Sequence, residues 1–237
     1  MQATKALARA LSSPNIGTPF LEAHTEQLVG GESPDTVIDA VRRAAAASSD
    51  TLLFSYAETG PESLDSPDGA EQPGSERSML ARVADLMWDS GATRLVVLLD
   101  CGSAEIAAQH FVRPTPAGRP QRGPSVSVLG ASRWMLFGSE IDPFMSTLTE
   151  ALQAGVNDGP QTLDLVTLRN AVEAKFTELR YMVENEYIPG AKQLLLHGGH
   201  EVALGLNRAF PPSSRYPSHY PGSFFAHPDA VREAEGY

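Results

Sequence analysis

The only cysteine of the chain, Cys101, directly follows Asp100 at the end of an uninterrupted apolar run. That run, residues 95–99, consists of Val and Leu, which is typical of a strand buried on both faces of a sheet. In open α/β sheets, ligands and chemistry gather beyond the carboxyl ends of the strands. A thiol there is a candidate nucleophile if a base lies within hydrogen-bond reach to take its proton. A catalytic role for Cys101 therefore requires a base elsewhere in the chain.

Histidine is the side chain best suited to that task near neutral pH. The chain has six histidines: His24, His110, His197, His200, His219 and His227. His110 is nearest in sequence, but a helix predicted over residues 104–111 would carry it a helix length away from Cys101. His197 and His200 flank two glycines, and without a Cys, Asp or Glu at ligand spacing this pattern favours a turn over a metal site. We expect neither a metal nor a cofactor.

The periodicity of the chain predicts strands that alternate with helices. The predicted strands are 24–29, 51–57, 95–101, 125–132, 193–197 and 201–206. The predicted helices are 2–13, 34–49, 79–90, 104–111, 143–154 and 162–182. This alternation indicates an α/β fold with a mostly parallel central sheet and helices on both of its faces. The last two strands are too close for a helical crossover, so we expect them to form an antiparallel hairpin at one edge.

Composition sets the domain limits and excludes several classes of partner. An acidic stretch at 61–78 and a Pro/Gly/Arg-rich stretch at 113–124 are expected to be loops within one domain over 1–210, followed by an irregular tail over 211–237. The formal net charge of −11 argues against binding to nucleic acid or to an anionic membrane. No apolar run has the length of a membrane span, and a lone cysteine fits a reducing compartment, so we expect a cytoplasmic protein.

Segments at three strand ends resemble a bacterial caspase-like domain, of the peptidase family that includes caspases, metacaspases and orthocaspases. Residues 50–60, DTLLFSYAETG, resemble the family's strand that ends in Ala-Gly-His-Gly and carries the catalytic histidine. Residues 94–103, RLVVLLDCGS, resemble the strand that ends in Asp-Cys-Cys-His-Ser-Gly and carries the nucleophile. Residues 128–133, 144–155 and 201–208 are similar to the elements that follow. The resemblance implies a caspase-like three-layer sandwich.

The chain departs from the family pattern where the pattern carries chemistry. Alignment on Ala57 and Gly60 places Thr59 at the histidine position. Alignment on Asp100 places Gly102 at the nucleophile position and Cys101 one residue before it. The family's first strand, expected just before the helix at 2–13, is not found there: either the chain start is truncated, or another segment or a partner fills its place. Such a gap would leave an open sheet edge and favour strand donation by a partner or a second copy.

These departures predict a pseudoprotease: a catalytically inactive, regulatory or binding subunit in a setting such as bacterial defence or signalling. Its partner would be another protein or a second copy of the chain. Cys101 would then be a small buried apolar residue. The alternative is an active cysteine endopeptidase that uses Cys101 and cleaves after Arg or Lys, with Asp100 in the substrate pocket. Asp100 could equally cap the helix that starts at residue 104.

Overall fold

The structure is a computed structural model, and it describes most of the chain up to residue 211. The described residues are 2–13, 17, 20, 25–28, 32–57, 76–102, 104–113, 123–132, 143–182, 194–200 and 202–211. The elements are α1 (Gln2–Leu11), α2 (Pro34–Ala47), β1 (Thr51–Ala57), α3 (Glu76–Trp88), β2 (Arg94–Cys101), α4 (Ala104–Phe111), β3 (Ser125–Ser132), α5 (Pro143–Ala154), β4 (Thr162–Leu163), α6 (Leu165–Met182), β5 (Leu194–His197) and β6 (Gly205–Leu206).

The central sheet has four strands in the order β1-β2-β3-β5. The first three strands are parallel, and β5 runs antiparallel to β3. A separate two-stranded antiparallel sheet joins β4 to β6. The predicted α/β fold, with a mostly parallel sheet and an antiparallel edge strand, is therefore confirmed.

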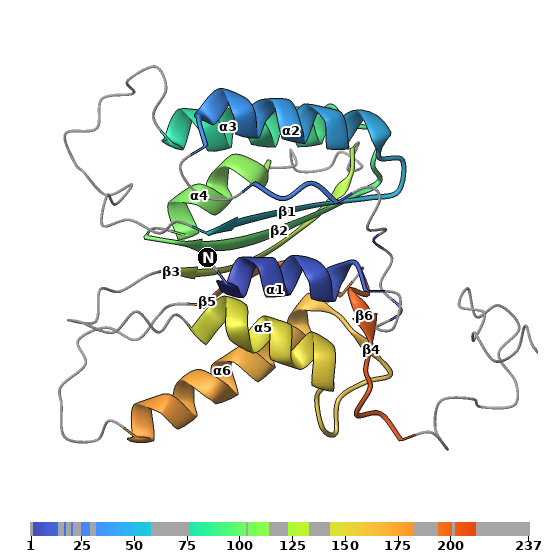
Figure 1. Ribbon diagram of the computed structural model, residues 1–237, viewed down its shortest axis with the longest axis vertical. Helices are drawn as coiled ribbons and strands as arrows, with labels where there is room; N and C mark the ends of the chain where they lie inside the picture. Colours follow the sequence, from blue (N-terminus) through green and yellow to red (C-terminus); the bar gives the residue numbers. More distant parts are fainter. Residues whose placement is uncertain are drawn as a thin grey trace, which may run out of the picture.

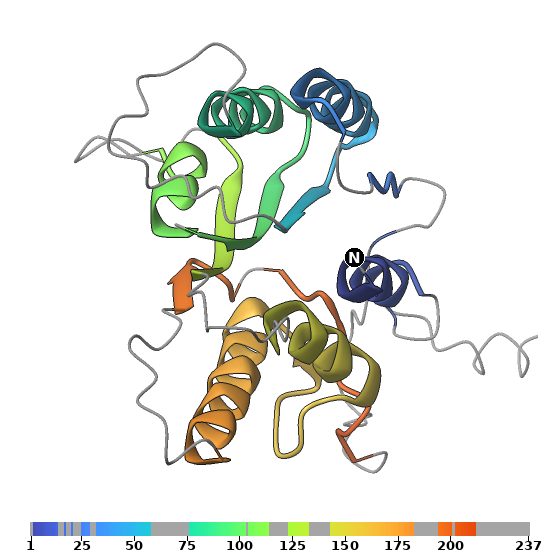
Figure 2. The ribbon, with the colours of Figure 1, turned by 60° about the vertical axis from the view of Figure 1, so that its left-hand side comes forward.

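Helices cover both faces of the sheet in three layers (Figures 1 and 2). Helices α2, α3 and α4 lie on one face, and α1, α5 and α6 lie on the other. Successive side chains of a strand point to opposite faces, so β2 supplies both cores. Leu95, Val97 and Leu99 pack with the first group of helices, whereas Val96 and Leu98 pack with the second. This double burial explains the uninterrupted apolar run in the sequence.

Helix boundaries follow the capping chemistry of the chain. The Ser33 side chain accepts a hydrogen bond from the Thr36 N–H at 3.2 Å, and Pro34 is the first helical residue of α2, as predicted. Asp164 similarly accepts from the Thr167 N–H at 2.7 Å. A capping residue is not itself helical, so the prediction of a helix from residue 162 was wrong, and Thr162–Leu163 forms β4 instead.

Two further predicted boundaries change in the structure. Residues 76–78 of the predicted loop 61–78 belong instead to α3, which begins at Glu76; residues 61–75 lie outside the described part. The predicted strand 24–29 is not formed over 25–28, where three of the four side chains are exposed. Arg113, Gly123 and Pro124, the described residues of the predicted loop 113–124, belong to no helix or strand.

The predicted hairpin between the last two strands was wrong. After β5 the chain turns through Gly198 (φ 64°) and Gly199 (φ 115°), and the Gly199 carbonyl accepts a hydrogen bond from the Leu165 N–H at 3.2 Å. This contact directs the chain toward the start of α6. The Leu204 N–H then donates to the Leu163 carbonyl at 2.7 Å, so the following residues pair with β4 rather than with β5.

One buried amide, Asn207, fastens the C-terminal segment to the turn after α5. Its Oδ1 accepts from the Val156 N–H at 2.8 Å, and its Nδ2 donates to the carbonyls of Val156 and Pro160, both at 2.8 Å. Asn207 is 1% exposed. Gly155 allows this close approach, because a Cβ atom there would lie 2.5 Å from Asn207 Oδ1.

We expect Asn207→Ala to lower the free energy of unfolding by about 2–4 kcal/mol, because it leaves several buried backbone groups without partners. Chemical denaturation measures this change. The matched control is Asn170→Ala, which removes an exposed amide from α6 and should change the free energy by less than about 0.5 kcal/mol. Equal effects of the two substitutions would contradict the role assigned to Asn207.

Candidate functional site

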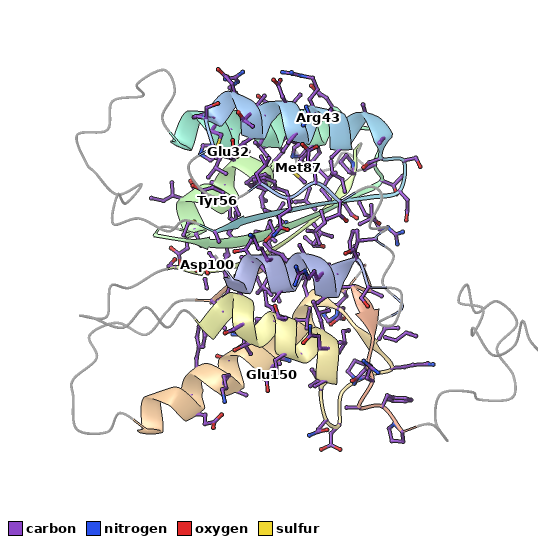
Figure 3. The ribbon with its side chains drawn as sticks, viewed as in Figure 1. Glu32, Arg43, Tyr56, Met87, Asp100 and Glu150 are labelled. Atoms are coloured by element: carbon purple, nitrogen blue, oxygen red, sulfur yellow. The ribbon has the colours of Figure 1, made fainter. Side chains whose placement is uncertain are left out.

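The carboxyl ends of the three parallel strands meet at one end of the sheet. Ala57 of β1, Asp100 of β2 and Ala131 of β3 are in register, and Asp100 lies at the end to which the arrows of β1 and β2 point (Figure 3). Gly102 follows in a turn directly after β2. Thr59, the residue at the family's histidine position, lies outside the described residues, as does Ser103.

Asp100 and Cys101 are adjacent in sequence but belong to opposite faces of the sheet. Cys101 is 0% exposed and lies in the core formed with α2, α3 and α4. By strand alternation, Asp100 faces the layer of α1, α5 and α6, together with Val96 and Leu98. The two residues therefore cannot line one pocket on the same face.

The residues that flank Asp100 in the sheet are small. Its neighbours across the sheet, Ala57 and Ala131, carry only methyl groups, and Asp100 is 1% exposed. Ser55 lies on the same face, two residues before Ala57 along β1 and in register with Leu98. Among the residues that the structure describes, the buried Ser55 hydroxyl has no hydrogen-bond partner. Strand alternation puts Ser55 on the same face of β1 as Ala57, but only the register with β2 shows that this is also the face of Asp100.

The described histidines lie away from the carboxyl end of β2. His197 is paired with Val128, which is in register with Val97, roughly 13 Å before Cys101 along the strand at the usual rise per residue. His110 lies in the last turn of α4, roughly 9 Å along the helix axis from its first residue. His200 follows the turn after β5. None of these three imidazoles is in position to deprotonate Cys101; His24, His219 and His227 lie outside the described residues.

The burial of Cys101 predicts a thiol that reacts slowly in the folded protein. A maleimide reagent should modify native protein far more slowly than protein unfolded in guanidinium, because reagents attack an accessible thiolate. The chain has one cysteine, so mass spectrometry of the modified chain gives an unambiguous readout. Cys101→Ala provides the blank. Rapid modification of the native protein would contradict the buried placement.

The structure brings His200 to an acidic partner that sequence spacing did not reveal. His200 Nδ1 lies 3.1 Å from Asp164 Oδ2, and Asp164 also caps α6. Burial alone would raise the pKa of Asp164, but hydrogen bonds from Thr167 and His200 lower this pKa below its ordinary value. Within the described residues, no three histidine, cysteine, aspartate or glutamate side chains gather closely enough to hold a metal ion.

The lowered pKa of Asp164 predicts a stability difference that depends on pH. An aspartate whose pKa is lower in the folded than in the unfolded state stabilises the fold at pH values above its unfolded pKa, which is about 3.9. This stabilisation is lost as the pH falls through the folded-state pKa. Asp164→Asn keeps a capping oxygen but removes the charge. We expect the variant to be less stable than the wild type at neutral pH, and the gap to narrow below about pH 4.

Denaturation curves from neutral pH to pH 2 measure this gap. The control is Asp158→Asn, at an exposed aspartate in the turn before β4. The difference in unfolding free energy between this variant and the wild type should not change over the same pH range. A gap for Asp164→Asn that does not vary with pH would contradict the assignment.

Among the described helices, none combines the length and apolar character that crossing a membrane requires. Comparisons of the chain with protein-family models, with curated proteins and with solved structures give no match.

Proposed function

We propose that the chain is a pseudoprotease: a caspase-like protein without peptidase activity that acts as a regulatory or binding subunit. The observation that carries the proposal is the placement of Cys101, which is fully buried in the core on the face of the sheet opposite to Asp100. A nucleophile must reach its substrate and its base, and the Cys101 thiol points into packed side chains.

The neighbouring residues support the same proposal. Gly102, at the position that aligns with the family's nucleophile, has no side chain with which to attack a peptide. A strand cannot bring the preceding residue forward by one position without turning it to the other face. The described histidines lie away from the carboxyl end of β2. Thr59, which aligns with the family's histidine, could not take up a proton near neutral pH as an imidazole does.

The binding role is assigned to the carboxyl end of the sheet. Asp100 is buried between two alanines of the neighbouring strands, and on the same face lies the Ser55 hydroxyl, which has no hydrogen-bond partner among the described residues. The resemblance to metacaspase-like enzymes suggests that this carboxylate would recognise a Lys or Arg side chain, and because Asp100 is 1% exposed, a partner could reach it only if this end of the sheet opened. The partner in this proposal is a protein or a second copy of the chain, in a cytoplasmic assembly for bacterial defence or signalling.

Reporter peptides that end in Arg or Lys test the proposal. We expect the wild type to release the reporter no faster than Cys101→Ala, because the thiol is buried and none of the described histidines lies beside it. A fluorescence time course at high protein concentration measures the release, with an added active protease to confirm that each reporter is cleavable. Turnover that is lost in Cys101→Ala would establish the alternative, an active endopeptidase, and overturn the proposal.

A further inference from the structure

Among the strands that the structure describes, β1 is the outermost on one side of the sheet. It is paired with β2 over all seven of its residues, from Thr51 to Ala57, without a bulge. The strand contains no proline and no charged residue. Natural edge strands usually carry a charge, a proline or a bulge, or are covered by other chain, because an unprotected edge invites another strand to add. β1 has none of these local protections, so its outer edge needs a cover.

Residues 25–28 lie in the place that such a cover would occupy. Both views show this short blue segment passing beside β1, on the side away from β2, in the space bordered by α1 and α2 (Figures 1 and 2). The segment belongs to no strand, and its first three side chains are exposed. It therefore runs along the edge without forming a ladder with β1 over residues 25–28.

A charged pair attaches this segment to α2. Glu26 binds the Arg43 guanidinium through both carboxylate oxygens, with Arg43 Nε donating to Oε2 at 3.3 Å and Arg43 Nη2 donating to Oε1. This two-point contact fixes orientation as well as distance. Arg43 lies near the end of α2 that leads into β1. The pair thus holds residues 25–28 between the helix layer and the sheet edge.

We propose that residues 25–28 are a strap that closes the outer edge of β1, and that the Glu26–Arg43 pair is its latch. The latched strap excludes an added strand, and its release presents an uncharged seven-residue edge. This inference adds a means of regulation to the proposed binding subunit. It concerns the fold of the single chain, however, and holds whether or not the chain cleaves peptides.

Hydrogen–deuterium exchange of the full chain, read by mass spectrometry, tests the latch. We expect Arg43→Glu to speed exchange in the peptide covering β1 about two- to fivefold, the range for loss of an exposed ion pair. The double variant Glu26→Arg/Arg43→Glu should restore slow exchange. Added salt should shrink the difference between wild type and Arg43→Glu, because it screens exposed pairs.

The control is Arg42→Glu, which breaks the exposed Arg42–Asp39 pair on the same helix and should leave β1 unchanged. The peptide covering β2 is the internal reference: equal acceleration of β1 and β2 would indicate general destabilisation and overturn the inference. So would equal effects of Arg42→Glu and Arg43→Glu, or no effect of either. None of these outcomes bears on the reporter-peptide assay, so the two proposals fail separately.

Discussion

The burial of β2 on both faces is the constraint on which the rest of the structure depends. Seven of its eight residues, all except Arg94, are buried, and alternate side chains enter two different cores. Neither core can be completed by one helix layer alone, so the chain must return to the sheet from both sides. The same constraint fixes the candidate site, because at the end of β2 it sends Asp100 to one core and Cys101 to the other.

Local signals in the sequence were enough to predict most of the layered architecture. The strands at 51–57 and 125–132 and the Ser33-Pro34 helix start depend on neighbouring residues, and the structure has them where they were predicted. The burial predicted for 51–57 was wrong, because β1 is the outermost described strand and only its Leu52 is buried. The hairpin failed because the partner of β6 is selected by a distant contact, the hydrogen bond between Leu204 and Leu163. The pairing of His200 with Asp164 was equally out of reach, since 36 residues separate them.

In the candidate site, too, features set by neighbouring residues could be predicted, whereas features set by contacts between distant residues could not. Strand alternation was enough to predict that neighbours at the end of a strand face opposite ways, and the structure confirms that Cys101 is buried. The sequence could not show that Ser55 lies on the same face as Asp100, in register with Leu98, because this depends on the pairing of β1 with β2. The predicted absence of a catalytic pair depends on Thr59 as well as on Cys101. Because Thr59 lies outside the described residues, this absence stays a prediction.

The amide of Asn207 has a consequence for the order in which the chain assembles. Its hydrogen bonds to Val156 span 51 residues, a segment that includes all of α6. Closing so long a loop costs chain entropy that a few hydrogen bonds recover only once α5 and β4 are in place. We therefore expect the C-terminal segment to join after α5 and β4 have formed. Its contacts would then slow unfolding more than they speed folding.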